Sequence, residues 1–317
     1  MKKPHRPRRL FFALFLLCCA ACAVFFSRRP VLLILDGPFV VLYGEGRLKA
    51  RSFITGLSLF RPVKTVLLSD AIGPDGVALA AADRAKKPYA ALFPGRYREG
   101  AELYAAQRPL THTIVLLEPG IKAPPTGDRP EGAGNGSFGG PGDGEAPQGY
   151  PRFLERDLRA DLYRAGLAAA LLAQDREGLT ACLTGPGMGD TEKEAFALGM
   201  AGVSGEVRYI SSELELPPDE TLAAAVFFGP AERLFMRKAP YPVVLFTWMD
   251  LSLAPDNVAV VFDDSLPSLA VRAVKMAALD RTGEGPAASI PASIHIIQKN
   301  AGKPLLSLSR QKPPENY

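Results

Sequence analysis

Residues that carry catalytic or metal chemistry are scarce in this sequence of 317 residues, which has four cysteines, three histidines and one tryptophan. The nucleophile motif G-x-S-x-G, the zinc motif H-E-x-x-H and the phosphate-binding P-loop are absent. His112 and His295 lie far apart in the sequence, and a lone histidine beside a strand is more often a structural hydrogen-bond donor than a base or a metal ligand. We therefore expect no enzyme activity, no metal and no cofactor.

Cysteine is also too scarce for a disulfide framework. Three of the four cysteines lie within the first 22 residues, and the fourth is Cys182. Once the N-terminal segment is removed, Cys182 has no partner for an intramolecular disulfide. It lies in the apolar stretch Leu179 to Thr184, so we predict a buried small side chain rather than a reactive thiol.

The first 29 residues have the order of an export signal. Five basic residues and no acidic residue precede the apolar stretch Leu10 to Phe26. A buried helix is the weaker interpretation, because this stretch has no polar face to turn toward solvent. Removal of residues 1–21 takes away five positive charges, so the formal net charge of +4 becomes −1. No patch of basic residues interleaved with aromatic residues remains, which argues against nucleic acid as a partner.

Three fates of this segment stay open, because about seventeen apolar residues suit both a short membrane span and a long signal sequence. Cys19-Ala20-Ala21-Cys22 resembles the lipobox of bacterial lipoproteins, and this resemblance implies acylation of the Cys22 thiol. Cleavage at Ala21-Cys22-Ala23 would instead release a free protein, and an uncut segment would be a membrane anchor. We expect an exported protein of the periplasm or the cell membrane.

The rest of the chain alternates short apolar runs with longer stretches of helical periodicity. Such alternation indicates parallel strands joined by crossover helices, so the predicted fold class is α/β. In the first half, the predicted strands are Val31 to Leu35, Val63 to Leu68, Tyr89 to Phe93 and Thr113 to Leu117. The predicted helices between them are Gly46 to Phe60, Asp75 to Lys86 and Arg96 to Gln107.

The second half repeats this pattern. It begins with apolar residues spaced three or four apart from Leu154 to Ala170, which predict a helix ending near Gly178, with Gly166 serving close packing. The predicted strands are Leu179 to Thr184, Glu206 to Ile210, Ala224 to Phe228, Pro242 to Thr247, Asn257 to Phe262 and Ser293 to Gln298. The predicted helices are Thr191 to Met200, Pro218 to Ala223, Ala231 to Lys238 and Ser265 to Leu279.

A segment rich in glycine and proline separates the halves. Residues 123–150 have hardly any apolar side chain, so we expect a disordered insertion that cannot bury enough surface to offset its ordering entropy. Two similar halves indicate two lobes, each with a parallel sheet flanked by helices. The first is expected over residues 30–122, completed by about 251–280, and the second over 151–250, completed by about 281–300. Residues 301–317 are expected to be a flexible tail.

The order of these elements resembles the type I periplasmic-binding-protein fold of sugar-binding, nucleoside-binding and LacI-like proteins, over roughly residues 30–300. Asp161 to Ala170 is similar to the family's helix that opens the second lobe with an Ala-Gly pair. Leu179 to Gly185 is similar to its following strand and glycine turn, and Glu194 to Gly199 to its F-x-x-G helix. Val243 to Asp250 resembles the strand that crosses back to the first lobe.

The resemblance implies a ligand held between two lobes, at the carboxyl ends of the strands, where open parallel sheets bind ligands. The residues that it places there are Asp36, Gly37, Asp70, Glu118, Gly185 to Gly189, Trp248, Asp250 and Asp263. A tryptophan face stacks on a sugar or a base, and a carboxylate accepts bonds from ligand hydroxyls or amines. A core or hinge position is the alternative for Trp248, and helix capping is the alternative for Asp250.

Two departures from the family leave alternatives open. Leu35 to Phe39 lacks the polar donors of the nucleoside-binding turn, and Gly229 to Glu232 lacks the family's Asn-Asp pair. Our first hypothesis is a membrane-tethered receptor that captures a small polar solute, of the sugar or nucleoside class, for an ABC importer. The second is a structural or interaction lipoprotein that kept the fold without a ligand. The third is an exported enzyme that uses Asp or Glu residues.

Overall fold

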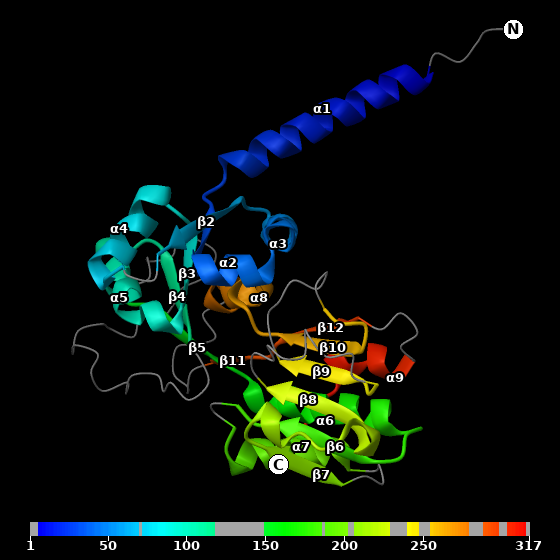
Figure 1. Ribbon diagram of the computed structural model, residues 1–317. Helices are drawn as coiled ribbons and strands as arrows, with labels where there is room; N and C mark the ends of the chain where they lie inside the picture. The colour runs from blue at the N-terminus through cyan, green and yellow to red at the C-terminus, as the bar shows by residue number, and fades with distance from the viewer. Residues whose placement is uncertain are drawn as a thin grey trace, which may run out of the picture.

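The computed structural model describes residues 6–69, 72–117, 149–185, 188–201, 206–228, 240–246, 254–278, 288–297 and 303–314. Its strands form two separate sheets of six strands each (Figure 1). The first sheet contains β1 (Val31–Asp36), β2 (Val63–Leu68), β3 (Ala90–Pro94), β4 (His112–Leu116), β5 (Arg152–Arg156) and β11 (Ala288–Ile290). The second sheet contains β6 (Leu179–Leu183), β7 (Val207–Ile210), β8 (Leu222–Phe228), β9 (Val243–Phe246), β10 (Val258–Asp263) and β12 (Ser293–Ile296).

Parallel pairing dominates both sheets. The first has the strand order β11-β5-β4-β3-β1-β2, and all its described pairs are parallel. The second has the order β12-β10-β9-β8-β6-β7, and among its described pairs β10 and β12 alone are antiparallel. The predicted α/β class with two parallel-stranded lobes is therefore confirmed.

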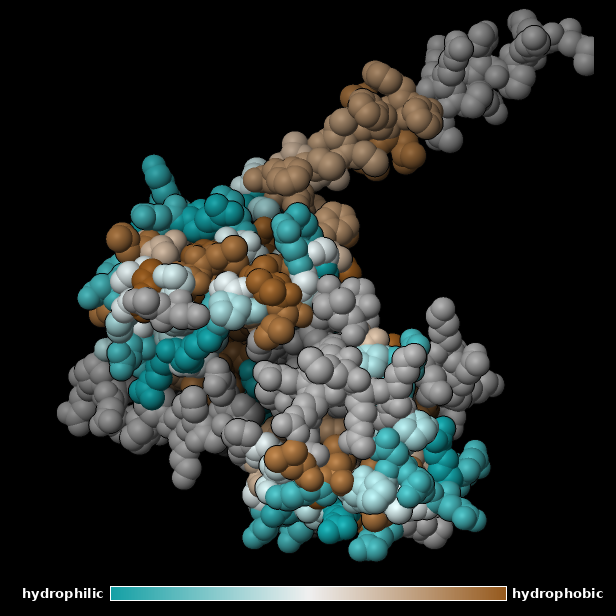
Figure 2. Space-filling view, viewed as in Figure 1, coloured by the Kyte–Doolittle hydropathy of each residue, from teal (hydrophilic) through white to brown (hydrophobic). Residues whose placement is uncertain are grey.

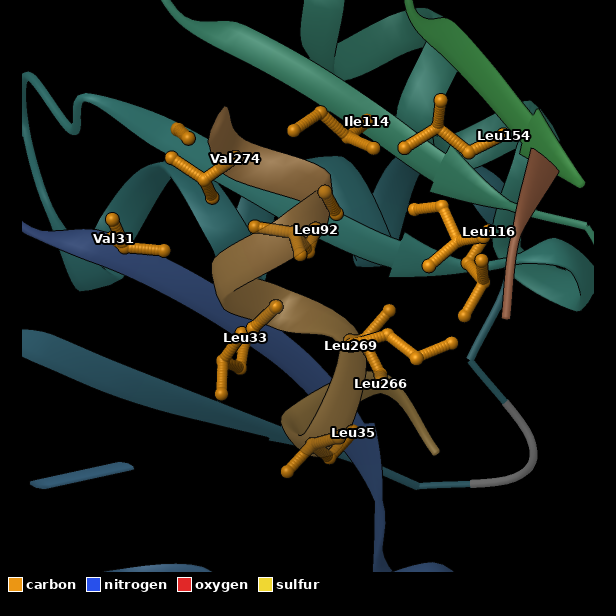
Figure 3. Packing of buried hydrophobic residues seen from close by; sticks show 14 of the residues in the cluster. Val31, Leu33, Leu35, Leu92, Ile114, Leu116, Leu154, Leu266, Leu269 and Val274 are labelled. Carbon is orange, nitrogen blue, oxygen red and sulfur yellow. The ribbon is translucent and has the colours of Figure 1, made fainter. Parts of the chain in front are cut away.

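Helices cover both faces of the first sheet, and this unit is called the first lobe. Its helices are α2 (Gly37–Tyr43), α3 (Glu45–Leu59), α4 (Pro74–Arg84), α5 (Arg98–Gln107) and α8 (Leu266–Ala278), with the 3-10 turn η1 (Gly95–Tyr97). Side chains of β1 alternate between two buried cores: Val31, Leu33 and Leu35 pack under α8 (Figure 3). Leu32 and Ile34 pack on the other face, under α4 and α5. A strand covered on both faces has to be apolar along its length, as β1 is from Val31 to Leu35.

The second sheet and its helices form the second lobe. The helices are α6 (Leu158–Ala173), α7 (Asp190–Met200) and α9 (Lys303–Leu306), with the 3-10 turns η3 (Glu213–Glu215), η4 (Asp219–Thr221) and η7 (Leu308–Arg310). Where α6 crosses α7, Gly166 and Gly199 face each other across the contact. A methyl group on Gly199 would overlap the carbonyl oxygen of Tyr163, and one on Gly166 would overlap that of Phe196. The prediction that Gly166 serves close packing is confirmed.

Some predicted elements are wrong, and each error has a local cause. Leu154 lies in strand β5, not in a helix. The prediction was wrong because the spacing between Leu154 and Leu158 matches the helical pattern of α6, which begins only after the strand. Residues predicted as the helix Pro218 to Ala223 form η4 and the start of β8. Helix α2 and strand β11 were not predicted, since both are short. The predicted helix Ala231 to Lys238 and almost all of the insertion lie outside the described residues.

In the described residues the chain crosses between the lobes three times. The positions of these crossings differ from the predicted ones. It passes from β5 to α6, from β10 to α8 and from β11 to β12. β5, expected in the second lobe, belongs to the first sheet, and the crossing expected after Val243 to Asp250 follows β10 instead. The sheet to which a strand belongs depends on its hydrogen-bonding neighbours, which no single-strand pattern contains.

Both ends of the described chain have a defined placement. Helix α1 (Arg6–Ser27) projects from the first lobe, and its described surface is brown almost throughout (Figures 1 and 2). In the described part of the chain, no helix meets the length and hydropathy needed to span a membrane. The flexible tail expected from residue 301 is wrong for α9 and η7, because Leu305 and Leu308 are buried in the core of the second lobe.

Candidate functional site

The three crossings between the lobes are joined to one another by polar contacts. Arg156, the last residue of β5, pairs with Asp264 in the second crossing, with 2.5 Å between Nη1 and Oδ2. The amide of Asp157 donates to the carbonyl oxygen of Ile290 at 2.9 Å, which joins the first crossing to the third. These three adjacent connections are here called the hinge region, because in two-lobed proteins small torsion changes in a few such residues rotate one lobe against the other.

Asp161 on α6 anchors the third crossing from the second lobe. Its Oδ2 accepts a hydrogen bond from the Ala292 amide at 2.7 Å. Its Oδ1 accepts from the Arg164 guanidinium at 3.0 Å, and Arg164 also donates to the carbonyl oxygen of Gln311 at 2.8 Å. Burial raises the pKa of Asp161 to about 7, although the Ala292 amide and the Arg164 charge both lower it. The hinge therefore contains a carboxyl group that titrates near neutral pH.

This raised pKa makes part of the stability depend on pH. Between the ordinary value near 3.8 and the folded value near 7, the folded chain holds a proton that the unfolded chain has lost. Stability is therefore highest below the lower value and falls as pH rises through the upper one. From pH 5 to pH 8 the wild type is expected to lose about 2 to 3 kcal/mol relative to Asp161→Asn, which cannot ionise. Urea unfolding of both proteins at each pH checks this, and parallel pH profiles would contradict it.

A second group of polar side chains, here called the Asp263 cluster, joins α2 and α3 to the second lobe. It consists of Tyr43, Arg47, Arg51, Asp263, Ser268 and His295. Asp263 ends β10, and its Oδ2 accepts from Arg47 Nη2 and from Ser268 Oγ, both at 2.6 Å. Its Oδ1 accepts from the Ser265 amide at 3.1 Å. The carboxylate is completely enclosed and has a donor on each oxygen.

The electrostatics of this cluster favour an ionised Asp263. Burial by itself raises the pKa of the carboxyl group, but hydrogen bonds from His295, Ser265 and Ser268 and the charge of Arg47 together hold that pKa below its usual value. His295 Nε2 lies 3.4 Å from Asp263 Oδ2 and 3.0 Å from Arg51 Nη2. Arg51 Nη2 also lies 3.4 Å from His295 Nδ1, so the ring can donate from Nε2 to Asp263 while Nδ1 accepts from Arg51.

At the carboxyl end of β1, Asp36 also has partners within the protein. Its Oδ1 accepts from the Phe39 amide at 3.2 Å, so that Asp36 caps the N-terminus of α2. Its Oδ2 pairs with the half-exposed guanidinium of Arg96, from η1 after the neighbouring strand β3. Gly37 begins α2 with open space where a side chain would be. At the far end of α2, the Tyr43 hydroxyl lies 3.2 Å from Ser268 Oγ.

The structure thus places two of the predicted carboxylates near the two ends of α2. Asp36 caps its N-terminus, and Asp263 is joined through Ser268 to its last residue. No described contact joins the two carboxylates directly. The other predicted ligand contacts lie outside the described residues; they are Asp70, Glu118, Trp248 and Asp250. At the glycine turn, Gly189 is the N-cap residue of α7, and its amide donates to the Glu192 carboxylate at 3.0 Å.

Sequence reasoning missed the cations that hold these carboxylates. Arg47 and Arg51 lie one helical turn apart within the predicted helix Gly46 to Phe60, and this spacing places them on one face. The spacing of Arg47 and Arg51 is visible in the sequence, but nothing in the sequence indicates which acidic residue this face of the helix contacts. Asp263 lies 216 positions beyond Arg47, and His295 lies 244 beyond Arg51.

The sequence led to one prediction for Cys182 and one for Cys22, and the structure tests the first of them. Cys182 is buried in β6, and burial raises the pKa of its thiol to about 12, so the prediction of a buried small side chain is confirmed. Cys22 is exposed on α1, and its acylation stays a prediction. Within the described ranges, no group of three or more His, Cys, Asp or Glu side chains is placed to hold a metal ion.

Comparison with known proteins identifies the fold. No protein-family model matches the sequence, and no curated protein matches it in sequence. An ABC transporter system solute-binding protein from Conexibacter woesei has a TM-score of 0.54 at 10% identity, covering 89% of this chain and 94% of its own. A transcriptional activator of the comK gene from Bacillus halodurans has a TM-score of 0.53 at 13% identity, covering 90% and 99%. The fold is type I periplasmic-binding-protein-like.

Proposed function

We propose that this protein is an extracytoplasmic, membrane-tethered solute-binding protein that captures a small polar ligand between its lobes and passes it to an ABC importer. The observation that carries this proposal is the hinge of three adjacent crossings between two parallel-stranded lobes. Such a hinge permits the lobes to close on a ligand and reopen. One of the structural neighbours is a solute-binding protein of an ABC transporter system, which supports the same function.

The carboxyl ends of β1 and β3 are the proposed contact surface of the first lobe. Arg96 is the exposed cation there, and Asp36 orients it through an ion pair. A guanidinium fixed in this way donates charge-assisted hydrogen bonds to hydroxyl or carbonyl oxygens. The ligand is therefore proposed to be rich in oxygen, in the sugar or nucleoside class.

A thermal-shift screen of sugars and nucleosides tests the proposal. A ligand that binds only the folded protein raises the unfolding midpoint progressively once its free concentration exceeds the dissociation constant. We expect Arg96→Gln to abolish or strongly reduce the shift. Lys49→Gln is the matched control, because Lys49 pairs with Glu45 on the exposed side of α3, and its removal should leave the shift unchanged. An equal response of both variants would contradict the assignment of Arg96.

A second candidate function is favoured by the enclosed carboxylates. Asp263 is 0% exposed, and Asp36 already has a helix amide and a guanidinium as partners. Polar groups whose hydrogen bonds are already made offer little to a ligand in this arrangement. The alternative is a structural or interaction lipoprotein that retains the fold without a ligand. A screen in which no sugar or nucleoside shifts the midpoint would favour it.

A further inference from the structure

The outer surface of α3 is polar at its start, where Glu45 and Lys49 pair, but mostly apolar toward its C-terminal end, although a helix on the surface of a lobe ordinarily faces solvent with polar residues. Leu48, Thr55 and Gly56 are buried against the lobe. Phe53, Ile54 and Leu57 lie on the outer side and are 50% to 65% exposed. These three residues, with the exposed Phe60 that follows the helix, are called the α3 patch. Contiguous exposed apolar residues mark an interaction surface.

The α3 patch continues directly onto α1. The ring centroids of Phe25 and Phe60 are 5.9 Å apart in an edge-on contact. The same Phe25 ring comes within 3.4 Å of the position that a side chain would take on Gly56 of α3. The described residues of α1 from Phe11 onward are mostly exposed and apolar, and Figure 2 shows them as one brown surface. Whatever covers α1 therefore reaches the α3 patch as well.

The charges around the patch identify what covers it. No acidic residue occurs in residues 1–35 or 46–69, and Glu45, the one acidic residue of α3, is paired with Lys49. The exposed Arg28 lies with its guanidinium carbon 5.2 Å above the Phe60 ring, and Arg29 and Arg61 are its neighbours at the base of α1. Apolar side chains bordered by these three arginines match the interface of an anionic bilayer, where the apolar groups enter the acyl boundary and the cations meet the headgroups.

We propose that the α3 patch docks the first lobe against an anionic phospholipid bilayer, so that the lobe rests on the membrane that holds the N-terminus. This inference rests on the membrane tether of the proposed function. Either form of tether brings lipid to the patch, because Phe25 lies three residues after Cys22, or about 5 Å along a helix. An acyl chain on Cys22 and an uncut α1 therefore both place the bilayer beside α3.

Photocrosslinking of the full-length protein tests this docking. Benzoylphenylalanine is placed at Leu57, or at Leu79 of α4, which is also a leucine exposed on a helix of the first lobe. The protein is reconstituted in vesicles of phosphatidylcholine and phosphatidylglycerol and irradiated. We expect phospholipid adducts at position 57 but not at position 79, and fewer adducts in vesicles of phosphatidylcholine alone. An unchanged thermal midpoint of each variant verifies that the label leaves the fold intact.

Other outcomes overturn the proposal in distinguishable ways. Adducts between two copies of the chain would make the patch a self-association surface, and adducts to α1 would show that α1 itself covers it. Vesicle flotation reports the tether separately. Protein that floats with vesicles without a lipid adduct at position 57 would overturn the docking and leave the tether intact. Protein that does not float would overturn both.

Discussion

Asp263→Ala is expected to destabilise the folded protein by about 3 to 5 kcal/mol, the usual effect of removing one partner of a buried ion pair. The substitution removes the acceptor that Arg47, Ser268 and the Ser265 amide share. Arg47 and Asp263 are both largely buried, so water cannot readily replace the lost carboxylate. Urea unfolding at neutral pH measures the change.

The matched control for Asp263 is an ion pair on the exposed side of α3. Glu45 and Lys49 are 2.8 Å apart and both well exposed, and exposed pairs of this kind contribute about 1 kcal/mol or less. We expect Glu45→Gln to shift the urea midpoint only slightly. If Asp263→Ala and Glu45→Gln had similar effects, the Asp263 cluster would not be holding the lobes together.

Gly199→Ala is the second substitution with a large expected effect. The added methyl group would overlap the Tyr163 carbonyl oxygen and would lie within contact distance of Gly166, so α6 and α7 would have to move apart. Overpacking of a tight contact destabilises by about 1 to 3 kcal/mol, and a clash with backbone atoms belongs at the upper end. The measurement is the free energy of unfolding in urea.

Gly46→Ala separates this packing effect from the general effect of replacing glycine. Gly46 is also helical, on α3, and nothing lies within 4 Å of the position of its added methyl group. Alanine there restricts the unfolded chain without a clash, so stability should be unchanged or slightly higher. A comparable loss at both positions would mean that the α6–α7 contact is looser than its geometry indicates.

Much of the fold was predictable because the strands of parallel sheets are apolar on both faces. β1 and β3 were located within one residue of their ends, since each is a short apolar run bounded by turn-forming or charged residues. β5 was missed because only Leu154 of its five side chains is buried, and two arginines and a glutamate occupy other positions. Strand pairing supplies the stability of such a segment, and pairing partners are not written in the segment itself.

The candidate site was predictable only in part, for a related reason. Strand ends indicated Asp36 and Asp263, because parallel strands direct their carboxyl ends to one edge of a sheet. Their partners could not be inferred. Arg96, which pairs with Asp36, lies in η1 after strand β3. Arg47, which pairs with Asp263 of the second lobe, lies on α3 of the first lobe. Whether a carboxylate faces a ligand or a guanidinium depends on these distant residues.

Local patterns in the sequence were enough to infer the α/β class, the two-lobed division, the buried Cys182 and the close packing at Gly166. These follow from local composition and periodicity, which act through the few residues of one strand or helix. Local patterns could not show which sheet β5 and β10 join, where the hinge lies or which cations enclose Asp263. Those outcomes depend on contacts between residues far apart in the chain, and such contacts form only when the whole fold has brought them together.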